Sequence, residues 1–119
     1  MKDVAQIVGS LSRVPGVTVA MIVGAIDGLI VEASQVPGAQ TEGDRKKHTA
    51  ALAAYLYSKV TRASNAARLG VPAFMRLEAE KGHICVVGAR ELVLVTIVAP
   101  DANLGRVRLE MMTAAKEAA

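Results

Sequence analysis

The densest group of charged side chains in this chain is the run Asp44-Arg45-Lys46-Lys47-His48. Cations at a helix N-terminus oppose the helix dipole, at ~0.3–1 kcal/mol each. One interpretation is a solvated helix end whose charge is partly offset by Glu42 and Asp44. The other is a surface that meets an acidic partner, where charge raises the association rate more than the final affinity. Arg45, Lys46 and Lys47 are therefore the candidate partner surface.

The other residues that could do chemistry do not gather into a site. His48 and His83 are far apart and lack the cysteine or carboxylate spacing of a zinc site. The single Cys85 lies between Ile84 and Val86, which predicts a buried, inert thiol. The sequence has no G-x-x-x-x-G-K-[ST] or G-x-G-x-x-G motif and nothing that resembles a nucleophile elbow. We therefore expect no catalytic residue, no cofactor, no metal and no enzymatic activity.

Composition limits the remaining classes of function. The 119 residues are 52% hydrophobic but only 3% aromatic, which predicts a single domain over residues 1–119 with an aliphatic core. Few aromatic rings and a net charge of +3 spread along the chain argue against nucleic-acid binding. The longest apolar runs, Val14–Ile26 and Leu92–Ala99, are shorter than the ~20 residues of a membrane-spanning helix. We expect a cytoplasmic protein that does not insert into membranes, because the N-terminus shows no long apolar signal core.

Hydrophobic periodicity and turn residues predict the element order α-β-β-α-β-β-β-α. The expected elements are helix Asp3–Ser12, strands Val17–Gly24 and Leu29–Ser34, helix Arg45–Leu69, strands Pro72–Glu80, His83–Ala89 and Leu92–Ala99, and helix Ala102–Ala118. Asp27-Gly28 forms the first hairpin turn, Gln35–Gly43 is a loop, and Gly70 ends the middle helix. The short connections between strands favour antiparallel neighbours.

Two strands are apolar on both faces. Leu92–Ala99 is interrupted only by Thr96, and Val17–Gly24 only by Thr18, so both are expected inside the sheet with helices over both faces. Pro37 and Pro72 flank the second and third strands and favour sheet edges there. The short first and last helices then cover one face and the long middle helix the other. The fold class is therefore an α+β, three-layer α/β/α domain.

The middle helix has two sides of different character. One side is an apolar stripe that is expected to pack on the sheet. It consists of Leu52, Leu56, Val60, Ala63 and Ala67. The other side has small residues, namely Ala50, Ala54, Ser58 and Thr61, with Tyr57 nearby. This second side is either a solvated alanine-rich surface or a homodimer seam, since small residues let another helix approach closely.

The hairpin VTVAMIVGAIDGLIVEAS (Val17–Ser34) and the segment LVLVTIVAPDANLGRVRLEMM (Leu92–Met112), in this order and spacing, resemble the Roadblock, or dynein light-chain, family. The resemblance covers nearly the whole chain and is nearest to bacterial members, including gliding-motility GTPase activators. It implies a five-stranded antiparallel sheet with one helix on one face and two on the other. It also implies a homodimer in which the middle helices pair and the sheets join edge to edge through the third strand.

The resemblance also implies candidate interface residues and a function. The expected dimer interface comprises Ala50, Ala54, Tyr57, Ser58 and Thr61 of the middle helix and Phe74, Arg76 and Glu78 of the third strand. The implied function is a regulator that binds a small Ras-like GTPase and modulates its GTP hydrolysis or localisation, with no catalytic role for Arg45 or Arg90. The alternatives are a scaffold subunit of a signalling or motor complex and, with less support, a small-molecule sensor, because a fold does not fix a function.

Overall fold

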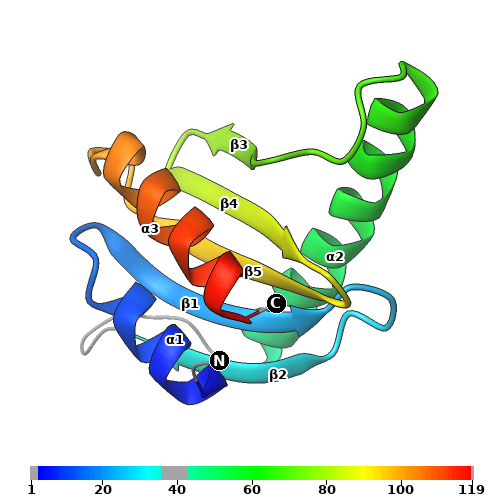
Figure 1. Cartoon of the computed structure of the whole chain (residues 1–119). Coiled ribbons are helices and arrows are strands. Elements are labelled where there is room, and N and C mark those ends of the chain that lie inside the picture. Colours follow the sequence, from blue (N-terminus) through cyan, green and yellow to red (C-terminus); the bar gives the residue numbers. More distant parts are fainter. Residues whose placement is uncertain (1–2, 36–42, 119) are drawn as a thin grey trace.

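The computed structural model describes residues 3–35 and 43–118. Its elements are α1 (Val4–Ser12), β1 (Val17–Gly24), β2 (Ile30–Gln35), α2 (Gly43–Ala66), β3 (Met75–Ala79), β4 (Gly82–Ala89), β5 (Leu92–Val98) and α3 (Leu104–Ala118). The strands form one antiparallel sheet in the order β2-β1-β5-β4-β3. Helices α1 and α3 lie on one face and α2 on the other (Figure 1), so the predicted α+β, three-layer fold is confirmed.

The positions of the strands follow from their composition. The doubly apolar strands β1 and β5 are interior and pair with each other, with Met21 opposite Val95 and Ala20 opposite Thr96. The edges are β2 and β3, as the prolines indicate, although Pro37 and most of the expected loop Gln35–Gly43 lie outside the described residues. Strand β3 is shorter than predicted, because the chain reaches the ladder with β4 only at Met75.

The face under α1 and α3 holds the larger of the two clusters of buried side chains. Ile7, Ile22, Leu94 and Met111 are each at most 2% exposed. Cys85 lies in the same cluster and is completely buried, as its apolar neighbours predicted. Thr96, a buried polar residue, donates its hydroxyl hydrogen to the Met111 Sδ at 3.2 Å. We call this the α1/α3 face.

Helix α2 packs on the sheet with the side opposite to the one predicted. Ala50, Ala53, Ala54 and Tyr57, at i, i+3, i+4 and i+7, are buried against the sheet, whereas Leu52 is exposed. The opposing sheet surface is already filled by large side chains, namely Val19, Met21, Val23, Val86, Val93 and Val95. Alanines let the helix approach this surface closely, so the expectation that the leucine stripe covers the sheet is wrong. We call this side of the sheet the α2 face.

The end of α2 also differs from the prediction. The helix stops at Ala66, and Arg68 takes a left-handed conformation with φ of 62°. The Leu69 N–H donates to the Ser64 carbonyl and the Arg68 N–H to the Asn65 carbonyl. This is the Schellman arrangement, which usually places glycine at the left-handed position. The predicted stop at Gly70 therefore falls in the loop after the helix.

The sequence predicts no membrane-spanning helix, because its apolar runs are too short. Over residues 3–35 and 43–118, no helix is both long enough and apolar enough to cross a bilayer.

A candidate partner interface around helix α2

Helix α2 covers only part of its side of the sheet. None of residues 58–66, which follow Tyr57 in the helix, is buried, and this half of α2 extends beyond the strands (Figure 1). Tyr57 is the last anchor: its hydroxyl donates to the Pro72 carbonyl at 3.5 Å, and its ring lies over Gly88 of β4. A side chain at Gly88 would collide with this ring, so glycine is required for the helix to sit here.

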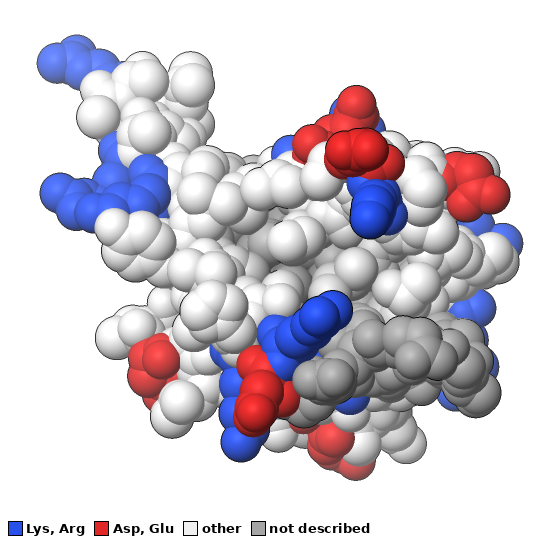
Figure 2. Space-filling model, turned by 180° about the vertical axis from the view of Figure 1, so that it is seen from behind, with Lys and Arg blue, Asp and Glu red and all other residues white. Residues whose placement is uncertain are grey.

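A hollow of about 330 Å³ opens between α2 and the outer strands. Its lining, which we call the α2–β3 hollow, consists of Thr49, Leu52, Ala53, Tyr55, Leu56, Met75, Leu77 and Ile84. Figure 2 views this face and shows an uncharged depression with charged residues around its rim. The hollow lies beside the anchored turns of α2, on the side that faces β3.

Large apolar side chains on α2 point away from the sheet beside this hollow. Leu52 is 54% exposed, Tyr55 62% and Leu56 38%, and Leu77 of β3 is 39% exposed. The ammonium of Lys59 lies 5.2 Å from the centre of the Tyr55 ring. Large exposed apolar patches with a polar rim mark protein or membrane interaction sites or ligand-binding grooves.

The structure separates the predicted dimer residues of α2 into two groups. Ala50, Ala54 and Tyr57 are covered by the protomer's own sheet, so their interpretation as an outer seam is wrong. Ser58 is exposed, and Thr61 is half-buried and donates its hydroxyl hydrogen to the Tyr57 carbonyl at 2.8 Å. The outward side of the helix instead carries the leucines that were expected to face the sheet.

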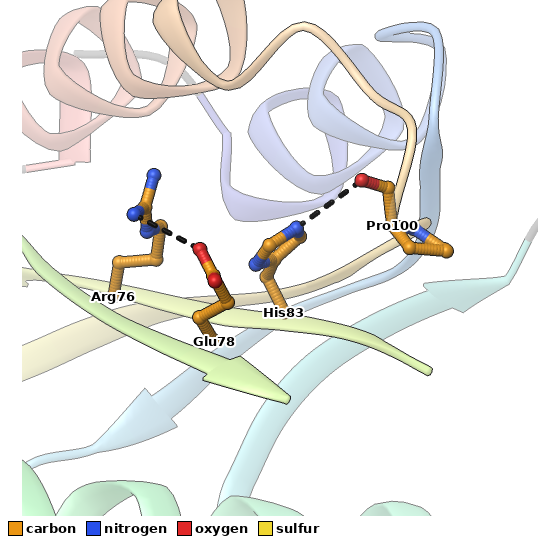
Figure 3. A network of polar contacts seen from close by, with 4 residues as sticks. All are labelled: Arg76, Glu78, His83 and Pro100. Carbon is orange, nitrogen blue, oxygen red and sulfur yellow. Dashed lines mark hydrogen bonds and ion pairs between the residues drawn. The ribbon is translucent and has the colours of Figure 1, made fainter. Parts of the chain in front are cut away.

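The predicted dimer residues of the third strand lie on the α1/α3 face, away from the α2–β3 hollow. Arg76 and Glu78 are opposite Cys85 and His83 of β4, and the Arg76 Nη2 is 3.2 Å from the Glu78 Oε1 (Figure 3). Phe74 packs against the core, with the Arg108 guanidinium 5.4 Å from its ring centre. These side chains flank the free edge of β3, which pairs with β4 on its other side.

The basic cluster lies in the first turns of α2. Arg45 and Lys47 are exposed and Lys46 is half-buried. Lys47 and the β1–β2 turn line a second hollow of about 410 Å³. The turn carries two apolar side chains whose exposure the sequence did not predict: Ile26 is 97% exposed and Leu29 66%.

The β1–β2 turn is held rigidly against α2. The Asp27 Oδ1 accepts a hydrogen bond from the Leu29 N–H at 2.9 Å, as expected of aspartate in a turn. Gly28 has a φ of 69°, and a Cβ there would lie 3.0 Å from the Cα of Ala51. Glycine therefore satisfies both the turn and the close contact, and the turn presents Ile26 beside Ala51, Tyr55 and Ser58 of α2.

In the described part of the chain, titratable side chains do not gather into a metal-binding cluster. Within it, no group of three or more His, Cys, Asp or Glu side chains could hold a metal ion. His83 is 6% exposed; its Nε2 lies 3.5 Å from the Pro100 carbonyl (Figure 3), and its Nδ1 has no hydrogen-bond partner. Burial raises the pKa of the Cys85 thiol, although the Thr96 hydroxyl and the Arg76 charge act in the opposite direction.

A sequence model of the Roadblock/LC7 domain matches residues 3–99. An uncharacterized protein of Methanocaldococcus jannaschii is 30% identical over 107 residues, which cover 90% of this chain and 89% of the relative.

Solved structures with the same fold are more distant in sequence. A Roadblock/LC7 domain from Streptomyces avermitilis superposes with a TM-score of 0.84 at 24% identity, covering 98% of this chain and 94% of that one. The gliding protein MglB from Thermus thermophilus gives a TM-score of 0.82 at 17% identity, with 93% and 82% covered. At these identities the likeness shows a shared fold and nothing finer.

Proposed function

This chain belongs to the Roadblock/LC7 family, and from that premise we propose that it is a homodimeric, non-enzymatic regulator in the cytoplasm. Its partner is a small Ras-like GTPase, whose GTP hydrolysis or localisation it modulates. The observation that carries the proposal is the α2–β3 hollow, an apolar surface that the protomer leaves uncovered beside a free strand edge.

A second copy of the chain fits the hollow. The exposed Leu52, Tyr55 and Leu56 supply the apolar side chains that an approaching α2 would bury. Strand β3 supplies unpaired backbone groups, which pair readily with another strand. The dimer interface would then consist of the outward side of α2 and the edge of β3, and Ala50, Ala54 and Tyr57 would act inside each protomer.

The GTPase would contact the basic end of α2 and the adjoining β1–β2 turn. Lys47 lies beside Leu29 of the turn, and both Arg45 and Lys47 are exposed, so an apolar contact is flanked by positive charge. Such a surface suits a partner with acidic residues around an apolar contact, since charge complementarity speeds association and excludes other partners. The regulator would act by binding one nucleotide state more tightly, which shifts the GTPase population towards that state.

The oligomeric state is tested by light scattering on the wild-type protein and two variants at micromolar concentration. We expect twice the chain mass of 12.4 kDa for the wild type. Leu56→Arg, in the hollow, should give the monomer mass, because a charge would be buried without a partner. Leu109→Arg, at an exposed position on α3, is the matched control and should stay dimeric. A monomeric wild type would contradict the dimer.

The partner is tested by capture from the native lysate with the tagged protein, once with a non-hydrolysable GTP analogue and once with GDP. We expect a small GTPase to be captured mainly with the GTP analogue, and its turnover to change when the protein is added in excess. The double variant Arg45→Glu, Lys47→Glu should lose this capture. Arg13→Glu combined with Arg106→Glu, at exposed positions on the other side of the sheet, should keep it.

A scaffold role is the alternative, because the same uncovered surface would serve an adaptor. In that case, a kinase or motor subunit would be captured equally in both nucleotide arms and no GTPase would be found. That result would contradict the proposed role as a GTPase regulator, but the proposed interaction surface would still stand.

A further inference from the structure

The second half of α2 and the loop after it project from the molecule, and their charged residues are all basic. Residues 45–77 include seven of the chain's 14 Lys and Arg residues and none of its 11 Asp and Glu residues. Three of these cations, Lys59, Arg62 and Arg68, are exposed on the projecting part. Figure 2 shows this part at the upper left, with blue atoms and no red ones.

Two large apolar side chains lie on the loop at the end of the same projection (Figure 1). Leu69 is 78% exposed and Val71 is 73% exposed. Gly70 lies between them, and a Cβ there would meet no atom of the described residues within 4 Å, so the loop is open to solvent at this point. None of these residues lines the α2–β3 hollow. We define the α2 tip as the three cations and the two apolar residues, namely Lys59, Arg62, Arg68, Leu69 and Val71.

Hydrogen bonds hold the loop of the α2 tip in place on both sides. The Leu69 N–H donates to the Ser64 carbonyl at 2.9 Å, and the Ser64 hydroxyl donates to the Gly70 carbonyl at 2.6 Å. Further along, the Pro72 carbonyl accepts from the Tyr57 hydroxyl at 3.5 Å. A loop that is already held in this way has less conformational freedom to lose when it binds, so its exposed apolar side chains are preorganised for contact.

We propose that the α2 tip docks on the surface of a bilayer that contains anionic phospholipids. The three cations would lie among the lipid phosphates, and Leu69 and Val71 would enter the boundary between headgroups and acyl chains. Each cation near an anionic bilayer strengthens binding about fivefold, and apolar side chains add to this by leaving water. The contact is peripheral, since only side chains enter the interface. This inference goes beyond the proposed function and does not depend on it.

The mixture of side chains favours a lipid surface over other polyanions. A nucleic acid would attract the same cations, but it binds through phosphate contacts and aromatic stacking, and the α2 tip has no aromatic side chain. An acidic protein would need a pocket shaped to receive Leu69 and Val71 from a projecting loop. A bilayer receives exposed aliphatic side chains beside basic ones without a matching shape.

Docking is tested by co-sedimentation of the full chain with vesicles at about 0.1 M salt, where the screening length is about 10 Å. One set of vesicles contains phosphatidylglycerol and phosphatidylcholine in equal parts, and the other contains phosphatidylcholine alone. We expect the wild type to bind the mixed vesicles, to bind them less as salt is added, and to leave the uncharged vesicles unbound. Absence of binding to the mixed vesicles, or equal binding to both sets, would overturn the proposal.

Charge at the α2 tip is tested by the double variant Arg62→Gln, Arg68→Gly. Two of the three cations are lost, so binding to the mixed vesicles should weaken about 25-fold. Glycine suits the left-handed conformation of residue 68, where φ is 62°, so the end of the helix is retained. The matched control is Arg13→Gln combined with Arg106→Gln, which removes the same charge from exposed positions on the other side of the sheet and should bind as the wild type does. Equal weakening of the two double variants would mean that net charge acts rather than the tip.

The apolar part of the contact is tested by Leu69→Ser combined with Val71→Ser, which keeps every charge. Binding to the mixed vesicles should weaken at least about tenfold, whereas binding to heparin, a soluble polyanion, should not change. Undiminished vesicle binding would make the tip a general polyanion site and would overturn the lipid contact. Light scattering should give both tip variants the mass of the wild type. A lower mass would place the tip in an interface between copies and would also overturn the docking, while a dimeric wild type would leave the homodimer standing.

Discussion

The two faces of the sheet are made from the same strands but are closed to different extents. On the α1/α3 face, two helices from the two ends of the chain cover the strands, and Ile7, Ile22 and Met111 are almost fully buried. On the α2 face, one helix covers the central strands from Ala50 to Tyr57, and the α2–β3 hollow stays open between these turns and β3. Strands β1 and β5 bury side chains on both faces, so the difference lies in the helices.

Burial of apolar side chains has different consequences on the two faces of the sheet. The closed face contributes apolar burial within one chain, at about 25 cal/mol per Å² removed from water. The open face leaves Leu52, Tyr55 and Leu56 in water, where they gain burial only when something else covers them. Substitutions on the first face should therefore unfold the protomer, and substitutions on the second should change what the protomer binds.

The largest effect should come from truncating a core residue of the closed face. Met111→Ala removes a fully buried side chain and the acceptor of the Thr96 hydroxyl, so we expect a loss of about 2–5 kcal/mol in the free energy of unfolding. Leu52→Ala, on the open face, should cost less than about 1 kcal/mol. Urea unfolding of both variants in the Leu56→Arg background keeps dissociation out of the measurement. Equal losses would mean that the α2 face is closed within the monomer.

A smaller effect should follow from adding a methyl group where α2 is anchored. Gly88→Ala places a Cβ in the space of the Tyr57 ring and should destabilise the fold by about 1–3 kcal/mol through overpacking. Gly9→Ala, inside α1, meets only the Arg13 guanidinium at 3.6 Å and should stabilise by about 0.5–1 kcal/mol. Thermal unfolding of the two variants checks the contrast. A neutral Gly88→Ala would show that Tyr57 does not hold α2 in place.

The smallest effect concerns the pH dependence of the Cys85 thiol on the closed face. Burial raises its pKa, so the unfolded thiol ionises at lower pH than the folded one. The stabilising contribution is complete below the ordinary thiol pKa of 9.0 and is lost as the pH rises through the folded value. Wild-type stability should therefore fall more steeply with rising pH in this range than that of Cys85→Ala. Parallel curves of stability against pH for the two proteins would contradict a raised pKa of the Cys85 thiol.

Labelling with a thiol reagent tests the same contrast between the two faces of the sheet. At pH 8 the folded wild type should react slowly at the buried Cys85, whereas the double variant Leu52→Cys, Cys85→Ala should react at the rate of a free thiol in the monomer. Fast labelling of folded wild type would show that the closed face opens readily.

Most of the architecture could be predicted from local pattern. The doubly apolar runs of β1 and β5 identified the interior strands, and Asp27-Gly28 identified the first turn. The predicted ends of the elements were less accurate. At the end of α2, for example, the left-handed conformation expected of a glycine is adopted by Arg68. The basic cluster was visible in the sequence, but the exposure of Ile26 was not, since one exposed isoleucine in a hairpin has no distinguishing local signal.

The sequence by itself determined which segments become helices and strands, which strands are interior, and that Cys85 is buried. The tertiary structure alone decided which side of α2 faces the sheet. Periodicity could not decide this, because Ala50 and Ala54 on one side and Leu52 and Leu56 on the other are all apolar. The choice depended on the space above the sheet: its surface was already filled, so the small side chains packed inward and the leucines were left outward.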